Sequence, residues 1–245
     1  MFVLLPPSET KATGGTGAAL DLSALTFPEL EPARTQVIDA LTAVCADIPA
    51  ARRALAVAGS KDLEIAGTAA LRETPTMPAM LRYTGVLYEA LDIQTLPRSA
   101  RLRAAERLLI TAALFGVVGG GDPVPAYRLS AGSVLPSIGG LPAFWRQRLA
   151  QPIQSLTRPV VDLRSGAYAA FAPIPDAISV RVVTENGAGQ RTVVSHFNKA
   201  TKGLLARALV TSRAEISDAA AVARVARRAG LRVERTGGRT LEIVT

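Results

Sequence analysis

The chain has 245 residues, 49% of them hydrophobic and only 4% aromatic, so it can bury a sizeable core made mostly of Ala, Val, Leu and Ile. Its single cysteine, Cys45, excludes an internal disulfide and a cysteine-based metal cluster. The first ten residues lack the basic segment of an export signal, and the longest apolar stretch (108–118) is shorter than the roughly 20 residues of a membrane helix, so we expect a cytoplasmic protein without a membrane partner.

Positive charge is concentrated in the later part of the chain. Residues 1–100 contain 8 Lys and Arg and 11 Asp and Glu, a net charge of −3, whereas residues 101–245 contain 20 and 9, a net charge of +11; together they give the formal net charge of +8. An arginine-rich surface of this kind is typical of nucleic-acid binding. Arg- and Ala-rich composition also arises in GC-rich genomes regardless of function, so charge alone leaves both explanations open.

The first half is predicted to be mainly helical. Residues 2–5 read as a short buried strand that Pro6 ends, followed by a Gly-rich loop without the spacing of a phosphate-binding Walker loop. Apolar residues at helical spacing predict further elements in chain order: helices at 32–47, 50–58 and 61–72, a turn and short helix within 77–92, and a helix from Ser99 that runs into a buried strand at 108–116.

The second half alternates strands and helices. We predict an irregular Gly- and Pro-rich segment at 116–133, then a helix that Pro142 opens, and then a strand at 159–163 followed by a short helix. A hairpin around Asn186-Gly187 comes next, with a second strand running to residue 197. Helices at 199–209 and at 217–229, the latter with Ser217 as N-cap, precede a second hairpin around 236–238. This order predicts an α+β (mixed α/β) fold: a single compact domain over residues 1–245, with a mixed sheet, two β-hairpins and surrounding helices.

Three segments share one design, in which an apolar strand runs into a turn of small polar residues. They are residues 4–11, 114–130 and 160–168. The carboxyl ends of strands line the ligand crevice in open α/β sheets. We therefore expect convergence of Lys11, Asp122, Tyr127, Arg128, Asp162, Arg164 and Ser165, although each segment alone is equally compatible with an ordinary surface loop.

The stretch "SHFNKATKGLLARAL" (195–209) predicts an anion site. Lys199 and Lys202 would share a face of the first turn of a helix, where cations oppose the helix dipole unless an anion binds there. His196, the only histidine, is left without a role. A metal site has little support, because His196 has neither a cysteine nor a carboxylate pair beside it.

Five segments in order resemble the YaaA-type peroxide stress protein family: "LLPPSETK", "RYTGVLYEAL", "LFGVVGGGDPVPAYRL", "VVDLRSGAY" and "SHFNKATKGLLARAL". The resemblance implies a compact cytoplasmic protein with a basic cleft that protects against hydrogen peroxide by limiting iron-dependent damage and that binds DNA. It implies anion or nucleic-acid contacts at Lys11, Arg82, Tyr83, Tyr88, Tyr127, Arg128, Ser165, Tyr168, Lys199 and Lys202, to which we add Arg164. It assigns no catalytic residue and no cofactor.

The chain departs from the family pattern at three places. The first motif reads Pro-Pro-Ser-Glu-Thr-Lys where Ser-Pro-Ala-Lys is common, and Asp162 stands where Asn is common. The family's link to DNA involves a helix-hairpin-helix, for which residues 55–68 are the best candidate here. Asp62 and Glu64 dilute the positive charge that such a phosphate-gripping element needs.

Of two functions, we predict the first and keep the second, an enzymatic activity that is not established, as the alternative. The first is a DNA-binding stress protein, with duplex, damaged or mismatched DNA as partner and tyrosines stacking on unpaired bases. The second is an enzyme acting on a phosphorylated or nucleotide-like small molecule in the same cleft. Arginines scattered over the surface would count against DNA, whereas a lysine with a strongly perturbed pKa would favour the enzyme. The oligomeric state is not predicted.

Overall fold

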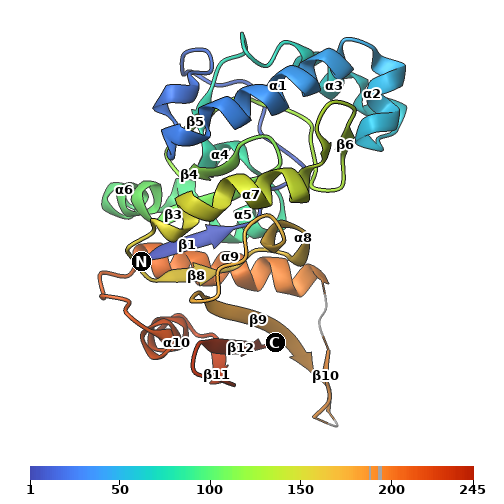
Figure 1. Cartoon of the computed structure of the whole chain (residues 1–245). Coiled ribbons are helices and arrows are strands. Elements are labelled where there is room, and N and C mark those ends of the chain that lie inside the picture. The colour runs from blue at the N-terminus through green and yellow to red at the C-terminus, as the bar shows by residue number, and fades with distance from the viewer. Residues whose placement is uncertain (188, 193–194) are drawn as a thin grey trace.

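Five parallel strands form the centre of the chain, and the first strand lies in the middle of the sheet (Figure 1). The computed structural model describes residues 1–187, 189–192 and 195–245. Across the sheet the strands follow the order β11 (Arg232–Arg235), β12 (Thr240–Val244), β9 (Ile178–Glu185), β8 (Val160–Asp162), β1 (Phe2–Leu5), β3 (Leu108–Ala112) and β4 (Gly116–Gly119), with β10 (Arg191–Thr192) paired to β9. The strands from β12 to β3 run parallel, whereas β4, β10 and β11 are antiparallel to their neighbours.

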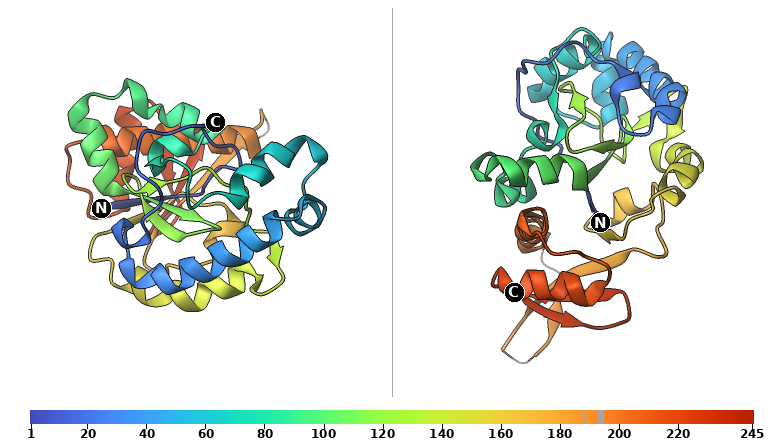
Figure 2. Two further views of the ribbon diagram at one scale, coloured as in Figure 1. Left: turned by 90° about the horizontal axis from the view of Figure 1, so that it is seen from above. Right: turned by 90° about the vertical axis from the view of Figure 1, so that its left-hand side faces the viewer.

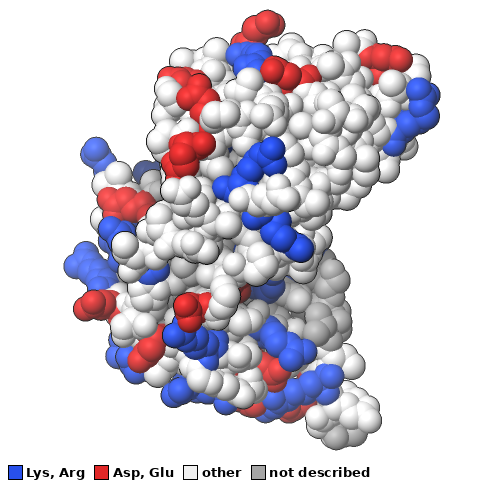
Figure 3. Space-filling view, in the orientation of Figure 1, with Lys and Arg blue, Asp and Glu red and all other residues white. Residues whose placement is uncertain are grey.

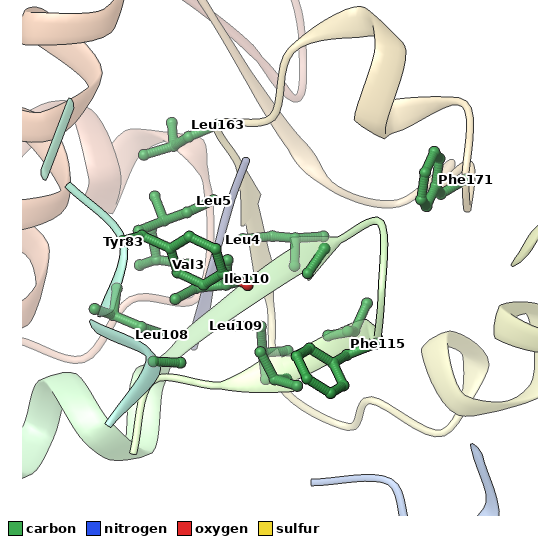
Figure 4. Packing of buried hydrophobic residues seen from close by; sticks show 14 of the residues in the cluster. Val3, Leu4, Leu5, Tyr83, Leu108, Leu109, Ile110, Phe115, Leu163 and Phe171 are labelled. Carbon is green, nitrogen blue, oxygen red and sulfur yellow. The ribbon is translucent and has the colours of Figure 1, made fainter. Parts of the chain in front are cut away.

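The strands β1 and β3 are buried along almost their whole length. Val3, Leu4 and Leu5 are inaccessible to solvent, and every residue of β3 is buried. Continuous apolar runs of this kind are typical of parallel strands that are covered on both faces. Figure 4 shows the side chains of β1 and β3 in one core together with Tyr83.

Helices cover both faces of the sheet (Figures 1 and 2). On one face α9 (Ser195–Thr211) packs against α5 (Val86–Leu91), α6 (Arg98–Arg107) and α10 (Ala219–Arg228). On the other face α7 (Leu141–Gln154) contacts β4, and α1 (Glu31–Cys45) lies beyond it with α2 (Ile48–Leu55) and α3 (Asp62–Ala69). This arrangement confirms the predicted mixed α/β fold in a single compact domain.

The remaining elements are short. They are the strands β2 (Met77–Pro78), β5 (Pro123–Val124), β6 (Val134–Leu135) and β7 (Gly139–Gly140), the helices α4 (Ala79–Arg82) and α8 (Gly166–Ala169), and the 3-10 helices Leu22–Ala24, Pro28–Leu30, Gly59–Lys61 and Ile93–Thr95. Within the described part of the chain, no helix is both long and apolar enough to cross a membrane.

Most predicted elements are confirmed with shifted ends, and three predictions are wrong. Gly116–Gly119 is a buried strand, not irregular: Gly116 adopts φ 72° and lies against Trp145, where a Cβ would come within 2.8 Å of the ring. The strand predicted to run to residue 197 ends earlier, because α9 already begins at Ser195. Asp218, not Ser217, caps α10, because its carboxylate reaches the N–H of Ala221 at 2.7 Å.

A glycine permits the close crossing of α5 and α9. A Cβ at Gly203 would overlap the carbonyl oxygen of Leu87 and would come within 2.8 Å of the Cβ of Ala90. The carbonyl belongs to the α5 backbone and cannot turn away as a flexible side chain would. Any residue larger than glycine must therefore separate the two helices.

We expect Gly203→Ala to destabilise the protein by about 1–3 kcal/mol, because the steric overlap outweighs the gain in helix propensity of about 1 kcal/mol. Urea denaturation of the variant and the wild type measures the difference. Gly67→Ala in α3 is the matched control, since its Cβ would meet no heavy atom within 4 Å. Equal stability changes in the two variants would contradict the close crossing.

Candidate functional site

The carboxyl ends of β1, β3 and β8 lie at one edge of the sheet. Leu4 in β1 pairs with Leu109 on one side and with Asp162 on the other, and all three strands are parallel. The chain passes from β1 to β3 and reaches β8 only later on the opposite side, so the strand order changes direction at β1. Ligands bind in open α/β sheets at the carboxyl edge of such a switch point.

The chain has four tyrosines, and two of them lie beside the lysine that follows β1 while the other two lie close to that pair. We call Lys11, Tyr83, Tyr88, Tyr127 and Tyr168 the tyrosine–lysine cluster. The Nζ of Lys11 lies 4.3 Å from the ring centroid of Tyr127 and 5.5 Å from that of Tyr83. The hydroxyls of Tyr83 and Tyr127 are 2.8 Å apart, and the rings of Tyr83 and Tyr88 are 5.7 Å apart. Burial raises the pKa of Tyr83, Tyr88 and Tyr127, and Tyr168 adds a smaller contribution in the same direction.

Main-chain hydrogen bonds fix the Lys11 loop against the segment that carries Tyr83. Lys11 and Tyr83 form an isolated antiparallel bridge, and the N–H of Ala12 donates to the carbonyl of Arg82 at 2.8 Å. Lys11 also donates from Nζ to the carbonyl of Ser8 at 3.1 Å. The position of the ammonium thus depends on backbone contacts as well as on the aromatic rings.

The buried side chain of Arg82 joins three segments of the chain. Its Nε donates to the carbonyl of Val124 at 3.1 Å, Nη1 to Ala12 at 2.5 Å and Nη2 to Pro75 at 3.0 Å. Burial lowers the pKa of Arg82, and the three carbonyls compensate for part of the lost hydration. Because these donors hold the fold, we leave Arg82 out of the ligand-binding set that the sequence predicts.

The amine of Lys11 lies in an environment that disfavours its charge. Burial, and after it the positive charge of Arg128, lowers the pKa of Lys11 to about 7, while Glu9 and Glu64 oppose the shift. The contact of the Lys11 amine with the face of the Tyr127 ring likewise opposes the shift, because an aromatic ring attracts a cation. Burial raises the pKa of all four tyrosines, that of Tyr168 to about 12, so their phenols are neutral hydrogen-bonding groups near neutral pH.

Arg128 lies beside the cluster in a fixed position. Its main-chain N–H donates to the buried Oγ1 of Thr68 at 2.9 Å, and only 13% of its side chain is exposed. Its Nη2 contacts Glu9 Oε2 at 2.7 Å and its Nη1 lies 3.6 Å from Glu64 Oε2. The Glu9 side chain is 62% exposed, so the carboxylate that occupies Arg128 can leave for solvent when another anion arrives.

A second group of charges follows β8. Arg164 is buried and binds Asp162 with two donors, Nε at 3.0 Å and Nη2 at 2.8 Å. It also donates to the carbonyl of Tyr168 at 3.3 Å, which connects this group to the cluster. Lys202 in α9 donates to the carbonyl of Arg164 at 3.1 Å; burial lowers the pKa of Lys202, and Asp162 opposes the shift.

Other predicted residues lie apart from these contacts. Ser165 and Lys199 are exposed, and the side chain of His196 lies outside the described residues. Asp122 accepts hydrogen bonds from Thr26 and from the N–H of Gly119, so it holds the turn after β4. The ionic groups near residues 55–68 are paired with one another, Arg52 with Asp62 and Lys61 with Glu64; the role of that segment in DNA binding stays a prediction.

Two features of the cluster differ from what its residue types suggest. Tyr83, Tyr88 and Tyr127 are at most 7% exposed, which removes them as stacking surfaces, and only Tyr168 retains partial exposure. Glu9 is a site residue that the sequence analysis missed. Its position two residues before Lys11, within the first motif, was the available signal.

A groove of about 760 Å³ lies at the opposite edge of the sheet, where the parallel strands begin. It is lined by the start of β8 (Val160), the start of β9 (Ile178), the N-terminal end of α10 and residues of α7. Its charged groups are largely engaged, because Arg239 pairs with Asp176 and Asp218 caps α10. The lysine with the strongly lowered pKa, Lys11, and the four tyrosines with raised pKa lie at the carboxyl edge instead, so we place the candidate site there.

The described residues contain no group of three or more His, Cys, Asp or Glu side chains arranged to hold a metal ion. Cys45 is buried, and burial raises the pKa of its thiol to about 11. A thiol in that state is a poor nucleophile.

We expect Lys11→Met to be more stable than the wild type at pH 6 by about 1–3 kcal/mol, because the native state disfavours the lysine charge. Between pH 7 and 10 the unfolded wild type binds the proton that the native protein has released, so wild-type stability rises with pH and the advantage of the variant shrinks. Urea denaturation from pH 6 to 10 measures this trend. The control Lys61→Met removes a surface partner of Glu64, and its free energy of unfolding should stay within about 0.5 kcal/mol of the wild-type value at every pH. A pH-independent difference in free energy between Lys11→Met and the wild type would contradict the lowered pKa of the Lys11 amine.

Comparison with known proteins adds information on relatedness. Residues 1–236 match the model of a family described as peroxide stress protein YaaA. A UPF0246 protein of Corynebacterium efficiens is 46% identical over the full length of both chains. A UPF0246 protein of Streptomyces coelicolor is 42% identical over 86% of this chain and 84% of its own, and an uncharacterized protein of Campylobacter jejuni is 30% identical over 55% of this chain and 54% of its own.

Proposed function

The chain belongs to the YaaA family of peroxide stress proteins, and from this premise we propose that it is a cytoplasmic enzyme that binds a phosphorylated or nucleotide-like small molecule at the tyrosine–lysine cluster. The observation that carries the proposal is the enclosure of the Lys11 amine by tyrosines, beside Arg128, at the carboxyl edge of the switch point. A lysine with a strongly shifted pKa in such a position is typical of a functional site.

Arg128 is the group best suited to receive the anion. A guanidinium binds phosphate with two parallel hydrogen bonds. Here Thr68 holds the main chain of Arg128, and only 13% of the Arg128 side chain is exposed. Its present partner, Glu9, is an exposed carboxylate that mimics the charge of such a ligand. Binding would exchange one anion for another without leaving the arginine unpaired.

We expect phosphate, pyrophosphate, AMP or ATP at a concentration of 100 Kd to stabilise the wild type by about 2.7 kcal/mol, a rise in Tm of about 5–10 °C. Arg128→Gln should lose most of this rise, and Glu9→Gln should increase it, because a competing carboxylate is removed. Thermal denaturation with each ligand measures the effect, with Arg72→Gln, an exposed arginine paired with Asp39, as the control. Equal shifts in Arg128→Gln and the wild type would contradict the site.

DNA binding is a second candidate, supported by a separate surface. Lys and Arg gather over the lower half of the view in Figure 3, in the region of α10 and the strands β9, β11 and β12, and along its left edge, where α6 lies. Among the described residues there, Arg227 is exposed but donates to the carbonyl of Val233. Six further exposed arginines stand outside the ion pairs; we call Arg98, Arg101, Arg213, Arg224, Arg228 and Arg235 the arginine surface. Such groups contact phosphates without reading sequence.

For this candidate we expect the affinity for duplex DNA to fall steeply with salt. Arg224→Gln/Arg228→Gln, which changes one face of α10, should lower the slope of log K against log salt by about 2. Fluorescence anisotropy with labelled duplex, mismatched and single-stranded DNA measures it, with Arg52→Gln/Arg72→Gln as the matched control. Absence of binding at low salt would exclude DNA as partner. The double variant Lys199→Ala/Lys202→Ala, measured in the same way, tests whether DNA also enters the proposed basic cleft.

Protection from iron-dependent damage would be indirect in either case. The described residues provide no cluster of carboxylate, imidazole and thiolate groups for iron. We therefore propose that the protein acts on a molecule that affects peroxide damage rather than on the metal itself.

A further inference from the structure

We infer that Lys11 is a reactive amine that forms an imine with a ligand carrying both a carbonyl group and an anionic group. The inference rests on the proposed function, because it names the chemistry that the small-molecule site would perform. It is carried by the contacts of the amine, by the phenol pair beside it and by the arginine that would hold the anionic end of the ligand.

The contacts of Lys11 leave its amine available. Its Nζ donates to the carbonyls of Ser8 at 3.1 Å and Glu9 at 3.4 Å, and no carboxylate of the described residues lies within ion-pair distance. The nearby Glu9 carboxylate is bound by Arg128 instead. The Lys11 side chain is half-buried, so a small molecule can reach the amine once Glu9 moves.

The charged and titratable groups around Lys11 favour the neutral amine near pH 7. Burial has the largest effect, Arg128 and Arg82 add to it, and Glu9 and Glu64 oppose it; the phenols of Tyr83 and Tyr127 face the amine from two further segments. A neutral lysine is the nucleophile in imine formation. At pH 7.5 a large share of Lys11 is therefore in the reactive form.

The other three lysines lack this combination. Lys61 pairs with Glu64 at 2.6 Å, and Lys199 is exposed. Lys202 is more buried than Lys199, but it donates to the carbonyl of Arg164 and faces Asp162, whose charge favours the ammonium form. With only four lysines in the chain, each one can be followed separately.

The reaction balances with groups that are present. The neutral amine attacks the carbonyl carbon, so that a C–N bond forms and the π bond of the carbonyl breaks. The nitrogen loses one proton and the carbonyl oxygen takes up one, which gives a carbinolamine. The nitrogen then loses its remaining proton as the hydroxyl leaves with a second proton, so that the products are an imine and one water. Tyr83 and Tyr127, with hydroxyls 2.8 Å apart, leave one phenolic hydrogen free to donate to the carbonyl oxygen.

The test uses the intact chain and pyridoxal 5′-phosphate, which combines an aldehyde with a phosphate. Equimolar probe is added, the imine is reduced with borohydride, and peptide mass spectrometry counts the label on each lysine. We expect Lys11 to be labelled at least tenfold faster than Lys61, Lys199 or Lys202 at pH 7.5. Its labelling should rise about tenfold from pH 6 to 8 and level off, whereas a lysine of ordinary pKa keeps rising about tenfold per pH unit.

Variants separate the role of the amine from that of the anion site. Lys11→Met removes the amine without adding a charge and should lower total labelling to that of the other three lysines. Arg128→Gln should lower labelling by pyridoxal 5′-phosphate but not by benzaldehyde, which has no anionic group. Labelling that follows exposure, with Lys61 and Lys199 ahead of Lys11, overturns the inference. If phosphate ligands still raise the Tm in that case, the proposed function stands without the imine; if they do not, both fail.

Discussion

The candidate site depends on the hydrogen bonds that the buried guanidinium of Arg82 donates to three main-chain carbonyls. A buried arginine needs partners for its donors, and here carbonyls of residues 12, 75 and 124 provide them. These carbonyls belong to the loop after β1, the segment before β2 and the strand β5, so one side chain ties together three parts of the chain that are far apart in sequence. Loss of the side chain leaves these carbonyls unsatisfied, which costs about 1–3 kcal/mol for each one that stays buried. Arg82 directly precedes Tyr83, the residue that bridges to Lys11, and its carbonyl accepts from the N–H of Ala12. Its placement therefore also sets the distance between the amine and the Tyr83 ring.

Arginines serve three different purposes in this chain, and net charge does not distinguish them. Arg34 is inaccessible to solvent and donates to four carbonyls, of Thr26, Phe27, Phe115 and Val117. Arg103 and Arg107 donate to the last carbonyls of α9, where cations favour the helix dipole. Others are neutralised by carboxylates, as Arg191 is by Glu185, Glu234 and Glu242. Only the exposed remainder is available for an external partner, so the basic composition overstates the charge that DNA would meet.

The tyrosine–lysine cluster and the arginine surface make different demands on a ligand. The cluster is enclosed, contains neutral phenols and an amine that titrates near neutrality, and has one positioned arginine; it suits a small anionic molecule. The arginine surface is open and hydrated, and suits a polyanion. The burial of Tyr83, Tyr88 and Tyr127 separates the two further, because rings packed in the core cannot stack on bases.

The sequence by itself determined the fold class, most of the elements and the segments that form the site. Apolar runs such as residues 2–5 and 108–112 predict buried strands because parallel strands covered on both faces need no polar residues. The same local signals misjudged Gly116–Gly119. Its first residue must be glycine because of contact with Trp145, a residue distant along the chain. Only the tertiary structure decided which of the predicted polar residues meet. Lys11 lies beside Tyr127 and Arg128, whereas Arg82 and Asp122 are consumed by carbonyls and N–H groups of the fold. Residue type tells what a side chain can bind, but burial and the nearest unsatisfied backbone group decide what it does bind, and both depend on contacts that are remote in sequence.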